Sequence, residues 1–389
     1  MTMKEQVQHR PAVKLLRVSD EHDSALAAFY RATWSPQATA DSVRCARRSA
    51  AVHNPVSPGD EPPSFIFIQD GKILGYLGTI PIRVWTQNRE SLAHWVKGFM
   101  VLPEFRNGPI GFLLLRETLR NLNCAMALAV LPVVVGLSVQ LGYTDLGRLS
   151  NFVRFLRPAR LLSRLRLEEI GFPGLPIWLR RSAALGQRVG LATAAGVCLD
   201  VFTRSAIGLR GRHPLSFTIE VSTPGSNEMD TLWQRARQTF AASLVRDSRY
   251  LNWRYLRDNS NTYRFVAIRF KGDLRALAVI RKPRADGDPR LHGATVATLS
   301  EWIFPLDEPL AGLTALAGAE HVAGDLGADA LLCSASHLIA FPLLRRRGFW
   351  KLPPNVHLLI RDSGNTCSLP NDLSDWWITR GDSNADDAF

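Results

Sequence analysis

The stretch Val101-Leu-Pro-Glu-Phe-Arg-Asn-Gly-Pro-Ile-Gly-Phe-Leu-Leu-Leu115 joins the end of an apolar segment to the start of a helix. Its central Arg-Asn-Gly predicts a tight turn. Pro109 follows at a first helical position, where a missing backbone N–H is tolerated. Ile110, Leu113 and Leu114 have the apolar spacing of a helix that packs on a sheet. The sequence therefore predicts a strand, a turn and a helix within fifteen residues.

The start of this helix is expected to attract anions. The first N–H groups of a helix have no intrahelical partner, and the helix dipole is positive at that end. Gly111 has no side chain that would keep a ligand or another backbone away. We therefore predict phosphate binding at the turn formed by Arg106, Asn107 and Gly108.

The stretch resembles the pyrophosphate-binding motif of the GCN5-related N-acetyltransferases, Pro-x-x-Arg/Gln-x-x-Gly-x-Gly/Ala after a central strand. Pro103, Arg106 and Gly111 fall on this motif, whereas Pro109 stands where its first glycine is expected and Gly108 lies one place early. The resemblance implies acetyl-CoA or another acyl-CoA as the ligand. The residues that it places at the ligand are Met100, Val101, Leu102, Arg106, Asn107, Gly108, Pro109, Ile110 and Gly111.

The order of elements around the motif supports the resemblance, which covers residues 12–158. Asp70-Gly71 between two apolar runs predicts a hairpin, and residues 91–101 predict the strand that enters the turn. After the motif we expect a buried strand at 124–130, a helix at 132–141 ending in Gly142-Tyr143, and a final hairpin at 146–156.

A second, weaker copy of this order follows. The expected elements are strands at 262–268 and 274–280, a strand at 295–304, a helix at 310–326, a strand at 330–334, a helix at 338–346 and a closing strand at 356–360. We interpret the repeat as an internal duplication. The second copy has no Arg-x-x-Gly-x-Gly between Ile303 and Leu310, so we expect it to lack an ordinary coenzyme A site.

Length and composition fit a two-domain α/β (mixed α+β) protein with two acetyltransferase-like domains. At 389 residues, 46% of them hydrophobic, the chain can bury two cores. The predicted organisation is a ligand-binding domain at 12–158, a basic helical linker at 159–214, a degenerate domain at 215–362 and an acidic tail at 363–389. We expect Trp376-Trp377-Ile378 to dock on a domain and residues 386–389 to fray.

The sequence gives no signal peptide and no obvious membrane-spanning segment, so we expect a cytoplasmic protein. The five cysteines are scattered, which favours neither a disulfide framework nor a metal site. The net charge of +12 is concentrated in residues 151–214, which hold eleven arginines and three acids. Three interpretations remain open for them: a solvated linker, contact with an anionic membrane surface, or contact with an acidic partner. No motif indicates specific nucleic-acid recognition.

Acyl transfer to an amine requires a held thioester, a neutral amine and a stabilised oxyanion. The resemblance implies that backbone N–H groups around Met100 to Leu102 bind the oxyanion. The candidate general bases are Glu90, His94 and Glu104, and we favour His94 because histidine titrates near neutral pH. The alternative is a strand histidine without a catalytic role. In the family a tyrosine often protonates the leaving thiolate, but Ser138 stands at that position here.

The sequence thus predicts an acyl-CoA-dependent N-acyltransferase, with acetyl transfer to a small-molecule amine, such as an amino sugar, in a cleft between the halves. The alternatives are a non-catalytic acyl-CoA-binding or scaffold protein and a peripheral membrane-binding protein. The oligomeric state is left open.

Overall fold

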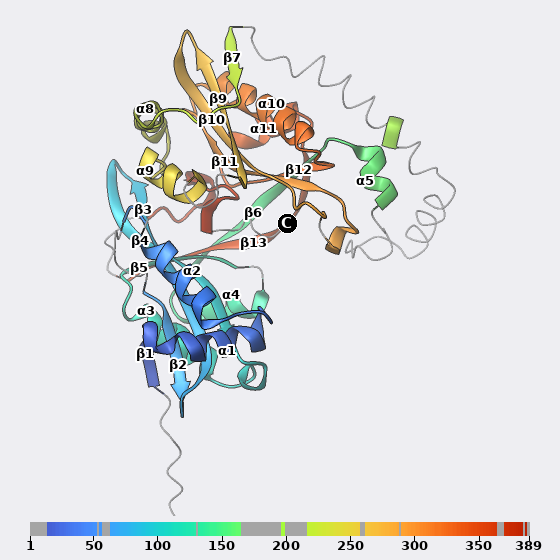
Figure 1. Cartoon of the computed structure of the whole chain (residues 1–389). Coiled ribbons are helices and arrows are strands. Elements are labelled where there is room, and N and C mark those ends of the chain that lie inside the picture. The colour runs from blue at the N-terminus through green and yellow to red at the C-terminus, as the bar shows by residue number, and fades with distance from the viewer. Residues whose placement is uncertain are drawn as a thin grey trace, which may run out of the picture. The chain divides into compact units, whose positions relative to one another are not determined.

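The computed structural model describes residues 14–52, 54–56, 63–129, 131–164, 196–198, 216–256, 261–287, 289–363, 369–383 and 386. The chain divides into two compact units (Figure 1). Unit 1 comprises Met1–Arg83, Leu92–Asp145 and Leu359–Cys367, and unit 2 comprises Val84–Ser91, Leu146–Leu358 and Ser368–Phe389. The tandem two-domain form is therefore present, while the individual boundaries proposed from the sequence stay a prediction.

Unit 1 has a mixed sheet in the order β1-β2-β3-β4-β5, in which β4 and β5 are parallel and β1, β2 and β3 are antiparallel neighbours. Its elements are β1 (Lys14–Arg17), α1 (Asp23–Thr33), α2 (Ala40–Val52), β2 (Phe65–Gln69), β3 (Lys72–Thr86), β4 (Arg89–Val101), α3 (Ile110–Leu119), β5 (Cys124–Ala129) and α4 (Pro132–Gln140). Strands β3 and β4 each place a few residues in unit 2.

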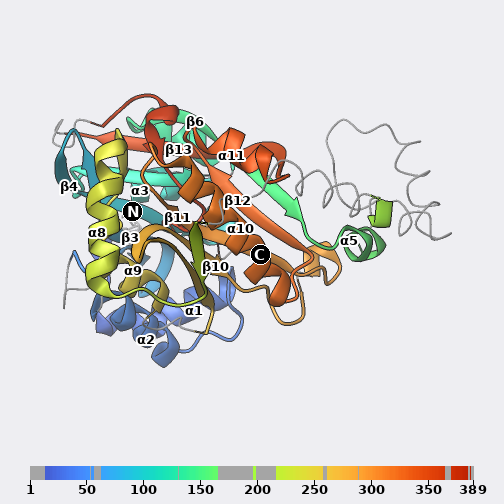
Figure 2. The same cartoon turned by 90° about the horizontal axis from the view of Figure 1, so that it is seen from above.

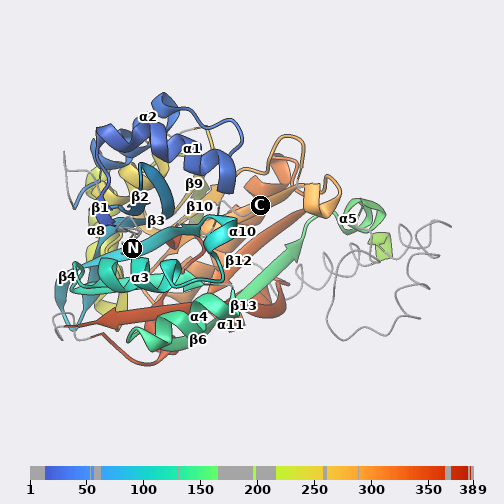
Figure 3. The same ribbon diagram turned by 90° about the horizontal axis from the view of Figure 1, so that it is seen from below.

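Helices α1 and α3 cover opposite faces of this sheet (Figures 2 and 3). A methyl group added at Gly75 of β3 would lie 3.1 Å from Leu114 of α3. The neighbouring Tyr76 contacts Tyr30 of α1 edge to face, with ring centroids 5.5 Å apart. Because successive side chains of a strand point to opposite faces, these two contacts place the helices on either side.

The strands of unit 2 include a mixed run in the order β6-β12-β11-β10-β9-β7, with β11 and β12 parallel. Its helices are α5 (Pro158–Arg164), α8 (Ser226–Ala236), α9 (Ser248–Leu251), η4 (Asn252–Leu256), α10 (Pro309–Asp325) and α11 (Ala340–Arg346). Its strands are β6 (Thr144–Phe155), β7 (Phe217–Glu220), β8 (Ala242–Leu244), β9 (Tyr263–Phe270), β10 (Asp273–Arg281), β11 (Val296–Ile303), β12 (Ala330–Ala335), β13 (Trp350–Asp362) and β14 (Trp376–Trp377).

The helices of unit 2 also lie on two faces of their sheet. Tyr255 of η4 contacts Tyr263 and Phe265 of β9, with ring centroids 5.0 and 6.4 Å apart. Gly318 of α10 faces Val266, the residue that follows Phe265, and an added methyl group would lie 2.5 Å from its side chain. The alternation along β9 thus separates α10 from η4, and Figures 1 and 2 show α8 and α10 on opposite sides of the strands.

The expected second copy is confirmed element by element, but two details of the sequence interpretation are wrong. Residues 146–156 do not form a hairpin, because one strand, β6, runs through them and pairs with β12 from Ser150 to Phe155. The predicted helix at 338–346 begins only at Ala340, and the exposed Leu338 precedes it. The predicted linker helix at 183–202 lies outside the described residues apart from residues 196–198.

The first arginines of the basic stretch bind unit 2. Arg154 is buried and lies 3.6 Å from Glu320 of α10. Arg157 donates to the Gly324 and Gly327 carbonyls at the C-terminal end of α10, where acceptors lack helical partners. Arg164 donates to the Gly293 carbonyl over 2.7 Å. For this described part, the solvated-linker interpretation needs correction, because these arginines attach β6 and α5 to the unit. Within the described residues no helix has the length and apolar composition needed to cross a membrane.

Candidate active site

The predicted turn forms directly after β4 in unit 1. Leu102 leads into a short 3-10 helix, Pro103–Phe105, and the Gly108 N–H donates to the Phe105 carbonyl over 3.1 Å. Arg106 Nε donates to the Val101 carbonyl over 3.1 Å. The turn is therefore fixed by its own hydrogen bonds, while its residues from Arg106 to Pro109 remain exposed.

Helix α3 starts at this turn with donors available to a ligand. Pro109 is its N-cap residue and provides no side-chain cap, and the first turn holds no acidic residue. The N–H groups of Ile110, Gly111 and Phe112 have no acceptor within the helix. Pro109 itself contributes no N–H, so this turn offers one donor fewer than a glycine would. The remaining donors and the helix dipole suit an anionic ligand.

Two glycines set the position of α3. A methyl group at Gly111 would lie 3.3 Å from the Phe99 ring and 3.6 Å from a Val101 methyl group of β4. A methyl group at Gly75 of β3 would lie 3.4 Å from the Met100 carbonyl. The α-carbon of Gly111 thus faces the sheet, which gives this glycine a packing role in addition to its free N–H.

Strands β4 and β5 pair only briefly before they separate. The described parallel ladder joins His94 to Ala125 and Trp95 to Met126, although β4 continues to Val101 and β5 to Ala129. Gly98, with a φ of +62°, lies within β4, three residues after the last paired residue, Trp95. The segment of β4 from Phe99 to Val101 therefore has no partner in the described ladder with β5, and its backbone groups can bind a ligand that lies between the two strands.

His94 lies where the two strands still pair. Burial lowers the pKa of its imidazole, while a hydrogen bond to the Cys124 carbonyl acts in the opposite direction. Nδ1 is buried and has no hydrogen-bond partner among the described atoms. A strand rises about 3.3 Å per residue, so His94 lies roughly 23 Å along β4 from Val101. Burial therefore favours the neutral imidazole, whose Nδ1 is enclosed by protein atoms.

The other titratable candidates are engaged elsewhere. Glu104 is exposed and lies 2.9 Å from Lys72, whose charge and hydrogen bond lower the pKa of Glu104. Glu90, which belongs to unit 2, lies 3.6 Å from Arg237. Ser138 and Tyr143 are both buried, and burial raises the pKa of the Tyr143 hydroxyl well above its usual value. Neither residue is placed as a solvent-accessible proton donor for a thiolate.

Sequence reasoning missed an aromatic group on the α1 face of unit 1. Tyr30 contacts both Trp34 and Tyr76, with ring centroids 5.9 and 5.5 Å away. Tyr76 covers Gly98, where an added methyl group would meet its ring at 3.3 Å. Trp34 keeps 72% of its surface exposed. The spacing of Tyr30 and Trp34, one helical turn apart, was the available signal.

No family model and no curated protein sequence matches this chain. Solved structures do resemble it. A GCN5-related N-acetyltransferase from Anabaena variabilis aligns with 93% of this chain and 75% of its own, at a TM-score of 0.57 and 12% identity. A conserved protein from Enterococcus faecalis, described as a probable N-acyltransferase, aligns with 90% of this chain and 73% of its own, at a TM-score of 0.56 and 11% identity.

Saccharomyces cerevisiae N-myristoyltransferase, solved with bound myristoyl-CoA, covers 95% of this chain and 86% of its own, at a TM-score of 0.56 and 10% identity. These likenesses span both units of the chain. Together with the separated parallel strands and the turn that follows β4, they identify the chain as having the GCN5-related N-acetyltransferase fold in its tandem two-domain form.

Proposed function

We propose that unit 1 is an acyl-CoA-dependent N-acyltransferase. The observation that carries the proposal is the juxtaposition of an uncapped helix start, α3, with the separation of β4 from β5. The first feature suits a pyrophosphate, and the second leaves β4 backbone groups for an extended acyl-bearing arm. The neighbours described as acetyl-, acyl- and myristoyltransferases support the same class of reaction.

In this mechanism the N–H groups of Ile110, Gly111 and Phe112 bind the pyrophosphate, and Arg106 keeps the turn closed. The β4 backbone from Met100 to Leu102 orients the thioester and stabilises the oxyanion. The amine nitrogen attacks the thioester carbonyl, so a C–N bond forms and the C–S bond breaks. The proton on the attacking nitrogen reaches the imidazole of His94 through intervening water molecules, because His94 lies roughly 20 Å along β4 from Met100 and cannot contact the amine directly. The sulfur leaves as thiolate.

The acceptor, the acyl chain length and the membrane association expected from the arginines remain predictions. A small-molecule amine is the proposed acceptor class, with an amino sugar as one candidate. Helix α4 after β5 keeps Leu131 and Val133 largely exposed, at 61% and 74%. Long-chain acyl-CoAs therefore belong in any substrate panel alongside acetyl-CoA.

The test is release of free thiol from a panel of acyl-CoAs in the presence of an amine library. Gly108 offers a matched pair of variants, because a side chain there is exposed and an added methyl group meets only the Phe105 carbonyl, at 3.4 Å. Gly108→Asp places a carboxylate beside the predicted phosphate position, whereas Gly108→Ala adds no charge. We expect the aspartate variant to lose at least tenfold in kcat/KM, which corresponds to about 1.4 kcal/mol, and the alanine variant to retain activity.

Equal activity of the two variants would place the ligand elsewhere. The observation that favours the alternative function, a non-catalytic acyl-CoA-binding protein, is the burial of Ser138 and Tyr143, because neither buried hydroxyl is accessible to a leaving thiolate. It predicts that the wild type binds acyl-CoA but releases no thiol with any amine.

A further inference from the structure

Strands β11 and β12 of unit 2 separate in the same way as β4 and β5. Their parallel ladder runs from Val296 to Thr298 on β11 and from Ala330 to Leu332 on β12. Strand β11 then continues to Ile303, and β12 continues to Ala335. Beyond Thr298 the two strands no longer pair with each other in the described ladder. We call the space between these unpaired ends the groove.

The C-terminal segment of the chain occupies this groove. On the β12 side, Thr379 forms an antiparallel bridge with Ala335, and the Ile378 N–H donates to Ser336 Oγ over 2.9 Å. On the β11 side, the Gly381 N–H donates to the Ser300 carbonyl over 2.7 Å. The backbone of the segment thus bonds to both separated strands, while Trp376 and Trp377 pair with β8 and residues 380–381 form a turn.

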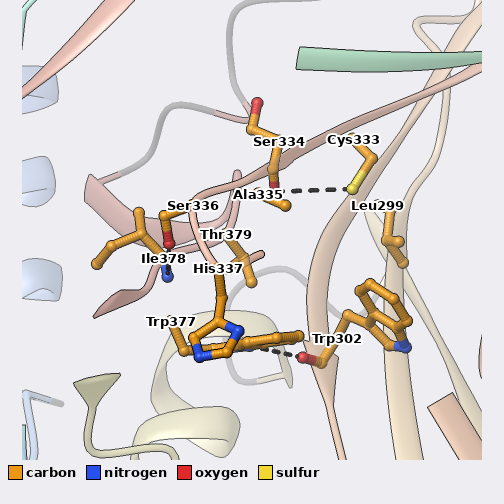
Figure 4. A pocket seen from close by; sticks show the side chains of 10 residues that line it. All are labelled: Leu299, Trp302, Cys333, Ser334, Ala335, Ser336, His337, Trp377, Ile378 and Thr379. Atoms are coloured by element: carbon orange, nitrogen blue, oxygen red, sulfur yellow. Dashed lines mark hydrogen bonds between the residues drawn. The ribbon is translucent and has the colours of Figure 1, made fainter. Parts of the chain in front are cut away.

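Trp377 of the segment is one of the residues that line the pocket shown in Figure 4, and its indole packs against aromatic side chains. The Trp377 indole stacks on Phe240, with centroids 5.3 Å apart and an interplanar angle of 15°. It also contacts Trp302, Phe304 and His337, and its Nε1 donates to the Trp302 carbonyl over 2.9 Å. Only 2% of Trp377 is exposed. The surrounding residues therefore contact both the ring and the N–H of the Trp377 indole.

The buried side chain of Arg246 binds a carboxylate of the segment, that of Asp382. Arg246 is completely buried, and its guanidinium lies 2.8 Å from Asp382 and 2.9 Å from Glu301 of β11. The Asp382 carboxylate also accepts from the Thr379 N–H over 2.8 Å. The contacts of the segment thus involve a tryptophan and, five residues later and after a turn at residues 380–381, an aspartate.

The start of α10 carries the carboxylate of Glu308, whereas the start of α3 in unit 1 follows the predicted phosphate-binding turn. Glu308 precedes α10, and its carboxylate accepts from Arg275 Nε over 2.8 Å. The Trp302 and Phe304 rings occupy the space in front of Gly312, where an added methyl group would lie 2.7 Å from the Phe304 ring. The features that suit an acyl-CoA in unit 1 are therefore filled by the chain's own residues in unit 2.

We propose that the separated strands β11 and β12 form a peptide-binding groove whose ligand is a segment with the pattern Trp-x-x-x-x-Asp, and that Trp376–Asp382 is its ligand in cis. The groove therefore excludes acyl-CoA and binds the same peptide in trans once the cis segment is weakened. This inference does not depend on the activity of unit 1.

The test uses the full-length Trp377→Ala variant and a fluorescent peptide of residues 370–383 with the wild-type sequence. A tethered segment competes at an effective concentration in the millimolar range. We therefore expect saturable one-to-one binding to the variant, at least tenfold tighter than to the wild type. The peptide carrying Trp377→Ala itself should not bind. Trp350→Ala is the matched control, because Trp350 lies on the same unit and is 52% exposed, and it should behave like the wild type.

A designed disulfide bond between the segment and β12 provides a second test of the proposal; we call it the lock. Ala335→Cys and Thr379→Cys stand opposite each other across the bridge, so oxidation of this pair in the Trp377→Ala background should abolish peptide binding, and reduction should restore it. Should Trp377→Ala fail to fold, Trp377→Leu keeps apolar volume while losing the indole N–H. The proposal is overturned if a folded variant does not bind the peptide, if the oxidised lock does not prevent binding, or if neither variant folds, since the segment would then be an inseparable part of the core.

Discussion

At the scale of single residues, the imidazole of His94 is the group that distinguishes catalysis from simple ligand binding. It is the one of the three candidate bases that is not held in an ion pair described by the structure, and its Nδ1 is buried without a described partner. Loss of a general base typically reduces a rate by about 10²–10⁴-fold. His94→Gln should therefore lower kcat by that factor while leaving the affinity for acyl-CoA nearly unchanged.

The pH profile provides an independent check on His94. Because burial lowers the pKa of its imidazole below 6.5, the neutral, active form persists at neutral pH and activity should decline only as the pH falls below that value. This acid limb should disappear in His94→Gln. Glu104→Gln is the control, since Glu104 is exposed and paired with Lys72, and it should leave both the rate and the limb intact. A wild-type acid limb that survives in His94→Gln would remove the residue from the mechanism.

Asp382 predicts a pH dependence of stability in unit 2. Burial and the neighbouring Glu301 raise the pKa of Asp382 to about 7. The charge of Arg246 acts in the opposite direction, but this single guanidinium is paired with both carboxylates. A carboxyl group with a raised folded-state pKa binds more protons in the folded state than in the unfolded state between about pH 4 and 7. Its contribution to the free energy of unfolding is therefore full below the unfolded-state pKa and lost as the pH rises through 7.

Asp382→Asn mimics the protonated carboxyl group. We expect the fall in stability of the wild type between pH 4 and 7 to be smaller in this variant, by up to a few kcal/mol. Urea denaturation at several pH values measures this difference. Parallel stability curves for the two proteins would show that Asp382 titrates as an ordinary carboxylate.

At the scale of elements, two glycines of α10 have opposite roles within one helix. An added methyl group at Gly312 would lie 2.7 Å from the Phe304 ring, whereas one at Gly324 would have no heavy atom within 4 Å. Gly312→Ala should lower the free energy of unfolding by about 1–3 kcal/mol through overpacking. Gly324→Ala should be neutral or raise it by up to about 1 kcal/mol, because alanine favours the helix. A stability loss at both positions would contradict the packing described for α10.

The turn and the elements around it were predictable, since each depends on residues close in sequence. Arg106-Asn107-Gly108 specifies a turn wherever it occurs, and Asp70-Gly71 specifies a hairpin. The single strand β6 was not predictable, because its partner β12 lies about 180 residues away in the chain. The position of Trp376–Asp382 between β11 and β12 was not predictable for the same reason. The apolar residues of the segment indicated that it docks on a domain, but its partners, Ala335 of β12 and Arg246, are distant in sequence.

The candidate site shows the same division. Its turn and helix start were found from the motif, whereas Tyr30, Trp34 and Tyr76 meet only in the folded unit.

The prediction that residues 386–389 fray is wrong for Asp386, which is buried and lies 2.6 Å from Arg254. The arginines near residue 154 indicated a surface role by charge alone, yet their acceptors are carbonyls and acids from distant helices and loops of unit 2.

At the scale of the whole molecule, the two units share an order of elements but differ in what lies at corresponding positions. In unit 1 the uncapped start of α3 and the separated end of β4 are free to bind a ligand. In unit 2 the corresponding places hold Glu308 with Arg275 and the segment Trp376–Asp382. The duplicated fold is therefore expected to provide a single acyl-CoA site.

Calorimetric titration of the full-length protein with acyl-CoA tests this central claim most directly, with acetyl-CoA and a long-chain acyl-CoA as ligands. The account predicts saturation at one ligand per chain for the wild type and for Gly108→Ala, and at least tenfold weaker binding for Gly108→Asp with an unchanged melting temperature. Saturation at two ligands per chain, or equal affinity of the aspartate and alanine variants, would contradict it.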